Sequence, residues 1–392
     1  MTRGRNARGF HIVGLAVGIL LLASCSQPTS WVDFTASTRE GFAPLVVTFT
    51  PSVQGVVTSH GWDFGDGATS TEERPTHTYA TPGSYTVSLT VEQASGSPVT
   101  VRKEGFVHVV ARARDPHVYW SERGTGTIRR GDRTGGSATP IVTGLISPED
   151  IAVSGSRVYW VDYGTGKVES ANLDGTGRRS IASDEQSATG IAVDALHAKV
   201  YWTTLPSGPS DTPARAGAIK RSNLDGSGVE TLVTYSPSDA FAWQVSVDPL
   251  GGRLYWISLD WAATSSPTGA SPLAACTGTI VKANLDGTHP VAIASGLCDP
   301  TALTSTSQGD GLDFVYFTDS DTGTVSRVNA DGTGRVALIT GAPGAESVAV
   351  DPAEGKMYWL AGTLLLRGNL DGSGVETIQT GLSLPEAVAI EH

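Results

Sequence analysis

The sequence has few of the residues on which several common protein classes depend. Only 3 of its 392 residues are cysteine and 2 are methionine, and just 17% are charged. Basic side chains number 27 against 39 acidic ones, which gives a net charge of −12. A protein that binds nucleic acid needs a basic face for the phosphates, so this balance excludes nucleic acid as a partner. The sequence also contains no HExxH or GxSxG motif and no phosphate-cradling loop.

Long segments of helical periodicity are missing too, whereas 47 residues are glycine and 21 are proline. Turn residues in such numbers, between short apolar runs, are typical of many strands joined by tight turns. The hydrophobic fraction of 39% is that of a folded globular chain. We therefore expect an all-β protein, with enough chain for two or three domains.

The longest apolar run lies near the N-terminus and is too short to cross a bilayer. It covers residues 12–23, IVGLAVGILLLA, and follows three arginines. About a dozen residues cannot span a membrane, which takes roughly 20, so the run is interpreted as a secretory signal. The string LASC at residues 22–25 resembles the lipobox of bacterial lipoproteins, whose cysteine is acylated and becomes the new N-terminus.

That resemblance implies a signal peptide over residues 1–24, a lipid on Cys25 and a short tether over residues 25–30. The lipid would anchor the exported protein to the membrane of the cell envelope, with the outer membrane or cell surface as its place in a cell that has two membranes. An ordinary secreted protein, which loses Cys25 with its leader, is the alternative. The other two cysteines, Cys276 and Cys298, form an even pair in an exported chain, which predicts a disulfide.

Residues 31–110 have the pattern of a small antiparallel sandwich. In YTVSLTV, residues 85–91, apolar and polar side chains alternate as in a strand buried on one face. The strings WDFGDG and HTYATPGSYTVSLTV resemble the PKD domain, an immunoglobulin-like module that commonly serves as a spacer or a weak adhesion module. For Trp62, Asp63 and Asp66 we expect a role in the core and the turn rather than in binding.

An aromatic pair then recurs six times at intervals of roughly 40 residues or more, which indicates a repeat architecture. The copies are VYWSE, VYWVD, VYWTT, LYWIS, VYFTD and MYWLA, with their tyrosines at Tyr119, Tyr159, Tyr201, Tyr255, Tyr316 and Tyr358. Five copies are followed by a hairpin sequence: SANLDGTG, RSNLDGSG, KANLDGTH, RVNADGTG and RGNLDGSG. Asparagine and Asp-Gly at fixed positions are what a tight hairpin requires.

A short apolar strand precedes every aromatic pair except the first. An unused copy, PEAVAI, stands at the C-terminus, at residues 385–390. A strand that arrives from the other end of the chain closes a ring of sheets and removes their free edges. After a linker over residues 111–116, we therefore expect a six-bladed β-propeller over residues 117–392, closed by its C-terminal strand.

These repeats resemble the YWTD repeats, the class B repeats of the low-density-lipoprotein receptor family, whose six copies build a six-bladed propeller. The fourth motif residue is acidic at Glu122, Asp162 and Asp319 only. Other residues replace it in the remaining three copies. If that carboxylate ties blades together in the family, the ties are fewer in this chain.

Aromatic and acidic residues gather around the two long insertions, which both follow the second strand of their blade. The loop YSPSDAFAW stands between these blades, next to the string SLDW. Such side chains, raised on loops over a rigid scaffold, are typical of a recognition surface. Packing of the insertions is the alternative role. The candidate ligand-binding residues are Tyr235, Phe241, Trp243, Asp260 and Trp261.

The loops that join one blade to the next also carry acids, which we expect around one opening of the channel. They are Glu149, Asp239, Asp299 and Glu346, with Glu386 in the closing blade. No cofactor is expected, but calcium bound by these acids would make the protein an extracytoplasmic lyase or lactonase. The favoured function is a lipid-anchored cell-surface protein that binds a protein or polysaccharide through the loop face of the propeller and catalyses nothing.

Overall fold

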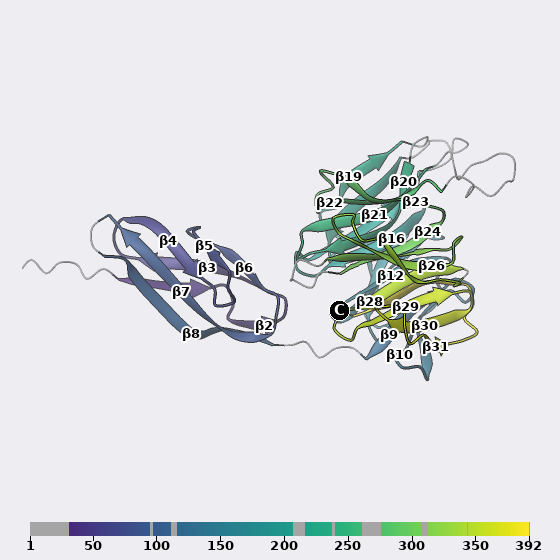
Figure 1. Ribbon diagram of the computed structural model, residues 1–392, viewed down its shortest axis with the longest axis horizontal. Helices are drawn as coiled ribbons and strands as arrows, with labels where there is room; N and C mark the ends of the chain where they lie inside the picture. Colours follow the sequence, from purple (N-terminus) through teal and green to yellow (C-terminus); the bar gives the residue numbers. More distant parts are fainter. Residues whose placement is uncertain are drawn as a thin grey trace, which may run out of the picture. The chain divides into compact units, whose positions relative to one another are not determined.

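A computed structural model describes residues 31–94, 97–110, 116–206, 216–236, 240–260, 276–306, 313–342 and 344–391. This part of the chain is all-β, as expected, and forms two compact units (Figure 1). The predicted signal peptide, lipidation site and tether lie outside the described residues. None of the described residues belongs to a helix long and apolar enough to cross a membrane.

The first unit is the predicted sandwich of two antiparallel sheets. One sheet has the order β1 (Val32–Ala36), β3 (Leu45–Val53), β6 (Thr76–Tyr79). The other has the order β2 (Glu40–Phe42), β8 (Val99–Val110), β7 (Gly83–Gln93), β4 (Val57–Asp63), β5 (Thr69–Ser70).

The WDFGDG string supplies core and turn, as predicted. Trp62 is 2% exposed, and its ring packs edge-on against Phe34, with centroids 5.2 Å apart. Asp63 accepts a hydrogen bond from the backbone N–H of Gly65, and Asp66 from that of Ala68. These are the side-chain bonds that stabilise tight turns, and Asp66 also pairs with His77 of β6 over 2.7 Å.

The second unit consists of six four-stranded sheets, which are the blades of a propeller. Blades 1 to 3 are, from the innermost strand outward, β32 (Pro385–Ile390), β9 (His117–Glu122), β10 (Thr127–Asp132), β11 (Ala138–Val142); β12 (Pro148–Ser154), β13 (Arg157–Asp162), β14 (Lys167–Asn172), β15 (Arg179–Ala182); and β16 (Ala188–Asp194), β17 (Lys199–Thr204), β18 (Gly217–Asn223), β19 (Glu230–Tyr235). Blades 4 to 6 are β20 (Ala240–Asp248), β21 (Arg253–Asp260), β22 (Gly278–Asn284), β23 (Val291–Leu297); β24 (Pro300–Thr306), β25 (Phe314–Asp319), β26 (Thr324–Asn329), β27 (Val336–Ile339); and β28 (Ala345–Asp351), β29 (Lys356–Ala361), β30 (Leu364–Asn369), β31 (Glu376–Gln379).

The aromatic pair of each repeat packs neighbouring blades together. Successive side chains of a strand point to opposite faces of its sheet, so the tyrosine and the next ring face different neighbours. Tyr119 of blade 1 shares a core cluster with Trp160 of blade 2, and Tyr159 shares the next cluster with Trp202. The same relation continues around the ring, through the clusters of Tyr201 with Trp256, Tyr255 with Phe317, Tyr316 with Trp359 and Tyr358 with Trp120.

The asparagine and Asp-Gly signature shapes the hairpin between the third and fourth strands. In blade 2, Asp174 accepts hydrogen bonds from the backbone N–H and the hydroxyl of Thr176, and the Asn172 side chain donates to that hydroxyl. Gly175 has a φ of 84°, and a Cβ there would collide with the carbonyl oxygen of Ile141 in the preceding blade. Glycine is therefore needed both for the turn and for the close approach of two blades.

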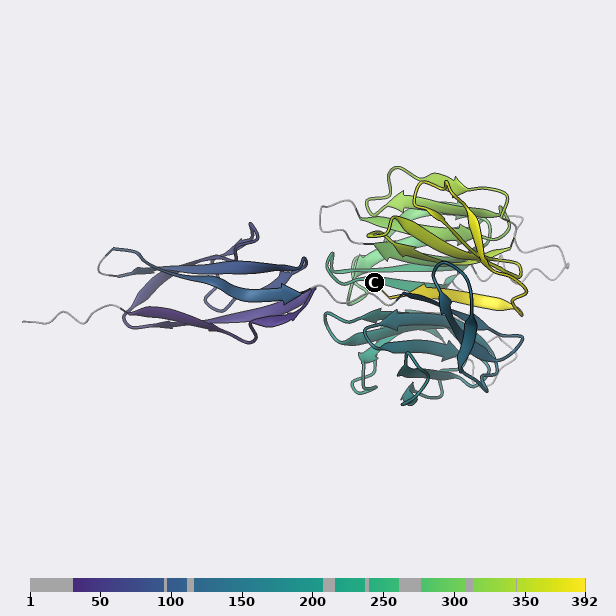
Figure 2. The same ribbon diagram turned by 90° about the horizontal axis from the view of Figure 1, so that it is seen from below.

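The ring closes through the C-terminal strand, as predicted. β32 pairs antiparallel with β9, and Val388 lies opposite Trp120. Figure 2 shows yellow β32 beside the dark blue strands of the first blade. Arg133, 4% exposed, fastens this closure: it forms an ion pair with Asp351 of blade 6 and donates to the carbonyl oxygen of Glu391 over 2.9 Å. The predicted disulfide between Cys276 and Cys298 is also confirmed.

Candidate functional site

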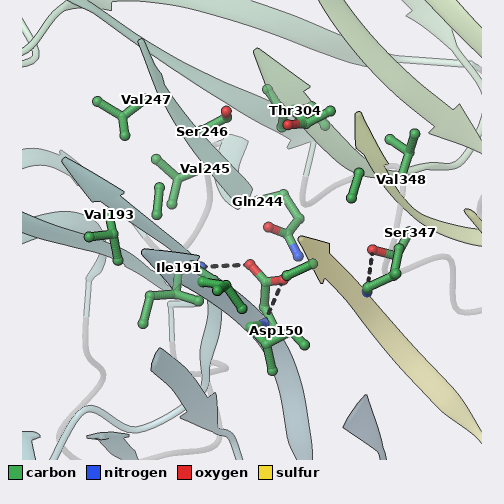
Figure 3. Close-up of a pocket in the computed structure, with 18 of the residues that line it drawn as sticks. Asp150, Ile191, Val193, Gln244, Val245, Ser246, Val247, Thr304, Ser347 and Val348 are labelled. Atoms are coloured by element: carbon green, nitrogen blue, oxygen red, sulfur yellow. Dashed lines mark hydrogen bonds between the residues drawn. The ribbon is translucent and has the colours of Figure 1, made fainter. Parts of the chain in front are cut away.

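The innermost strands of the six blades surround a cavity of about 140 Å³ at the centre of the propeller. Asp150, Gln244 and Ser347 lie at equivalent positions of their strands, each just before the residue that pairs with the aromatic ring of the next strand, and they face the cavity (Figure 3). The Asp150 carboxylate accepts hydrogen bonds from the backbone N–H groups of Ile151, over 2.8 Å, and Ile191, over 2.7 Å. Burial nevertheless raises the pKa of Asp150 to about 7, since a buried carboxylate loses the hydration of its charge.

Glutamates from three adjacent blades lie at one mouth of this channel, one position before the level of Asp150 in their innermost strands. They are Glu346 of blade 6, Glu386 of blade 1 and Glu149 of blade 2, each the second residue of its strand. Asp299 stands just before the innermost strand of blade 5. We call these four residues the acid arc, because they follow one side of the mouth.

The carboxylates of the acid arc are close enough to affect one another. Burial raises the pKa of Glu386 to about 7, and the charges of Glu149 and Glu346 contribute to that rise. Burial and the charge of Asp299 likewise raise the pKa of Glu346. Like charges that share a poorly solvated site favour the protonated form. The arc therefore gathers several carboxylates whose charges disfavour one another.

A single arginine partly neutralises the arc. Arg123, from the turn after β9, has its Nε 2.9 Å from Glu386 and its Nη1 3.9 Å from Glu149. Ser147 donates a further hydrogen bond to Glu149 over 2.8 Å. Arg123 could not be found from the sequence, because it lies in a turn next to the first aromatic motif and only the closed ring brings it to Glu386 of the C-terminal strand and Glu149 of blade 2.

The other side of the mouth has no acid at the second strand position. Thr189 of blade 3 donates instead to the carbonyl oxygen of Trp243 over 2.6 Å, and Thr301 of blade 5 to that of Ala345 over 2.8 Å. In blade 4, whose innermost strand starts two residues earlier, the residue equivalent in register is Trp243, which is half-buried and packs against the core between blades 4 and 5. The acids thus gather on one side of the mouth, and half-buried Trp243 takes the equivalent strand position on the other.

The remaining described candidates lie in the strands of blades 3 and 4, and Asp260 stands opposite Ala240, next to Phe241. The expected loop between blades 3 and 4 is shorter than predicted, because Tyr235 ends β19 and Phe241 lies within β20. Phe241 is only 4% exposed, and Tyr235 is half-buried, so burial raises its pKa to about 12. Asp260 is exposed at the end of β21. Trp261 and Asp239 lie outside the described residues.

Two of the three acidic fourth residues of the motif hold the loops that enter the innermost strands. Asp162 accepts hydrogen bonds from the backbone N–H groups of Ile146 and Ser147, and Asp319 from that of Cys298 over 2.9 Å. The third, Glu122, accepts instead from the indole N–H of Trp120 over 2.9 Å. Two carboxylates therefore position the approach to the acid arc.

The arc does not form a metal centre in the described part of the chain. No three histidine, cysteine, aspartate or glutamate side chains there are grouped so that they could hold a metal ion. Calcium-assisted catalysis at this mouth, which was the alternative from the sequence, has no set of ligands among these residues. What the arrangement offers chemically is a cluster of partly buried carboxylates at one mouth of the channel.

Two family models match parts of the chain. The model for the PKD domain matches residues 26–107, and the model for the low-density lipoprotein receptor repeat class B matches residues 156–195. Both resemblances seen in the sequence are thereby confirmed, and the propeller contains a repeat of the YWTD type. Together these two models leave most of the propeller unmatched.

Curated relatives match only short stretches. Collagenase ColA of Bacillus cereus is 48% identical over 61 residues, which are 14% of this chain and 6% of that protein. Collagenase ColQ1 of Bacillus cereus strain Q1 is 36% identical over 107 residues, or 26% of this chain and 11% of the relative. The pre-pro-metalloprotease PrtV of Vibrio cholerae is 41% identical over 61 residues, or 16% and 7%. The chain thus spans about a tenth or less of the length of these relatives.

Solved structures share the fold of the chain. A chain from the crystal structure of a nidogen/laminin complex superposes with a TM-score of 0.56 at 20% identity, covering 70% of this chain and 97% of that one. TolB from Acinetobacter baumannii gives a TM-score of 0.53 at 12% identity, covering 80% and 81%. Identities this low establish a likeness of fold alone.

Proposed function

We propose that this protein is a lipid-anchored protein of the cell envelope whose propeller binds a partner protein through the acidic mouth of its channel. The lipobox at residues 22–25 supports the anchor, and the disulfide between Cys276 and Cys298 fits an oxidising compartment outside the cytoplasm. The PKD-type sandwich acts as a spacer between the anchor and the propeller. The nidogen/laminin complex, which contains a chain of similar fold, is consistent with a protein partner.

The acid arc is the observation that carries this proposal. Three glutamates occupy the same strand position in three adjacent blades, and they are partly buried around one opening. Their pKa values are raised, so their negative charges are poorly compensated within the protein. A basic segment of a partner would supply the missing positive charge, and half-buried Trp243 offers a ring for a lysine or arginine to stack on.

The test compares capture of envelope proteins by the immobilised chain from Ser26 onward with capture by three variants. One variant combines Glu149→Gln, Glu346→Gln and Glu386→Gln, and a second is Trp243→Ala. The control combines Glu73→Gln, Glu92→Gln and Glu104→Gln, which removes the same net charge from the sandwich. A partner that the parent and the control capture, and that both mouth variants lose, supports the proposal.

Binding should also weaken as the pH falls from 8 to 6, because Glu386 becomes protonated over that range. High salt should weaken it further, since it screens the charges. Equal capture by the parent and both mouth variants would show that the partner does not use this mouth. Capture of a polysaccharide in place of a protein would contradict the proposed partner class.

A further inference from the structure

A second cavity lies on the hairpin face of the propeller, between blades 4 and 5. Its volume is about 320 Å³. The cavity and the acid arc lie on opposite faces of the propeller. The hairpins and the turns between first and second strands are on one face, and the acid arc is on the other. The polar residues that line it are Arg253, Tyr255 and Lys282 of blade 4 and Asp313, Asn329 and Asp331 of blade 5.

The cavity occurs where the repeat loses an apolar side chain. In blades 2, 3 and 6 the hairpin leucine packs against the core between its own blade and the preceding one, as Leu173, Leu224 and Leu370 do. Blade 5 has Ala330 at this position, and it packs against the corresponding cluster without the longer arm of leucine. Ala330 itself lines the cavity.

A second departure from the repeat leaves an acceptor open in the same place. In four blades a basic residue at the start of the second strand donates to the side-chain oxygen of the hairpin asparagine. The pairs are Arg157 with Asn172, Lys199 with Asn223, Arg253 with Asn284 and Lys356 with Asn369, at 2.7 to 3.0 Å. Blade 5 has Phe314 instead, so among the described residues Oδ1 of Asn329 receives no hydrogen bond.

The cavity also contains an unused hydroxyl. Tyr255 is 1% exposed and lines the cavity, but its hydroxyl has no hydrogen-bond partner within the described ranges. In blade 3, Arg221 donates to the equivalent Tyr201 over 3.4 Å. Blade 4 has Lys282 in place of that arginine, and its Nζ donates to the carbonyl oxygen of Ala330 over 2.6 Å. Burial raises the pKa of Tyr255, so its hydroxyl stays protonated and can donate.

From these groups we infer that the cavity binds an uncharged sugar residue. Arg253 and Lys282 are balanced by Asp313 and Asp331, so the lining selects no net charge. It offers donors in Tyr255, Arg253 and Lys282 and acceptors in Asn329 and the two carboxylates, and a sugar hydroxyl can both donate and accept. Both departures from the repeat converge on this cavity, and departures from the local rules of a fold are expected at functional sites.

The test uses saturation-transfer NMR on the chain from Ser26 onward, with the methyl glycosides of glucose, galactose, mannose and N-acetylglucosamine. Glucosamine and glucuronate are the charged comparisons. We expect at least one neutral glycoside to bind, and Ala330→Leu to abolish its signal by restoring the residue of the other blades. Tyr255→Phe removes only the hydroxyl and should weaken the affinity at least about tenfold, the equivalent of about 1.4 kcal/mol.

Tyr316→Phe is the matched control, because it removes the same hydroxyl one blade further on, outside the cavity, and should leave binding unchanged. The inference is wrong if none of the four neutral glycosides binds, or if only a charged sugar does. Binding that survives both Ala330→Leu and Tyr255→Phe would place the sugar elsewhere on the protein. If Ala330→Leu fails to fold, Tyr255→Phe alone decides.

Discussion

Arg367 in the last blade donates from Nη1 to the carbonyl oxygen of Arg133 in the first blade, over 2.8 Å. The same strand position provides this contact to the next blade elsewhere in the ring. Arg130 reaches Leu173, Arg221 reaches Leu285 and Lys282 reaches Ala330, each through a carbonyl oxygen. A basic residue of the third strand thus joins successive blades on the hairpin face, and the pair of Arg367 and Arg133 completes the ring where the chain ends meet.

Arg133 should contribute strongly to stability, because it joins three parts of the closure. Besides Asp351 and Glu391, it donates from Nε to the carbonyl oxygen of His117 over 3.1 Å. Arg133→Ala would leave Asp351 buried without its cation, and removing one partner of a buried ion pair costs about 3–5 kcal/mol. Urea unfolding would measure this loss.

The control is Arg130→Ala, which removes a single half-buried bond to a carbonyl and should cost about 1 kcal/mol. If Arg133→Ala unfolds at the same urea concentration as Arg130→Ala, the ion pair with Asp351 does not contribute to closure.

Deletion of residues 383–392 should open the ring. Without β32, the first blade loses its innermost strand, and β9 has an unpaired edge at the channel. We expect the single cooperative transition of the propeller to become broad and to move to a lower temperature. Calorimetry would measure this, and an unchanged transition would show that the sheets hold together without the C-terminal strand.

Stability should fall as the pH rises from 5 to 7.5. The pKa values of Asp150 and Glu386 are raised to about 7 in the folded protein, so the folded state holds protons that the unfolded chain has already released near its ordinary values. The unfolding free energy therefore decreases with pH across this window and levels off above it. Glu386→Gln should flatten the dependence, which urea unfolding at several pH values would measure.

Glu230→Gln is the control for this effect, since Glu230 lies on an outer strand and pairs with Arg221 across 2.7 Å. It should leave the slope between pH 5 and 7.5 as in the parent. A stability that increases with pH over this window would mean that the carboxyl groups of the acid arc do not have raised pKa values in the folded protein.

Cys25→Ala should release the protein from the membrane fraction. If the lipobox is processed, the thiol of Cys25 carries the acyl chains, and each buried CH₂ of such a chain contributes about 0.8 kcal/mol to membrane binding. Fractionation of cells and mass spectrometry of the N-terminal peptide would test this. Ser24→Ala, which keeps the cysteine, is the control, and a Cys25→Ala protein that stays with the membrane would rule out the lipid anchor.

The sequence by itself determined the fold of this protein. Period-two alternation with the six aromatic pairs specified the blades. A strand that is buried on both faces must belong to a sheet that packs between two other sheets. The Asp-Gly hairpins specified the turns, since few other residues adopt positive φ. The extra apolar strand PEAVAI at residues 385–390 specified the closure. It was the one such strand with no aromatic pair after it, and the first aromatic pair was the one with no such strand before it.

Only the tertiary structure decided which side chains meet. Glu149, Glu346 and Glu386 are far apart in the sequence, and equal position in three strands becomes proximity only when the strands surround one channel. Phe241 and Tyr235 looked like loop residues, but strand pairing extends past the apolar run and draws them into the sheet. The cavity beside Ala330 is visible only where two blades pack together, because a missing side chain leaves a space only when its neighbours are in place.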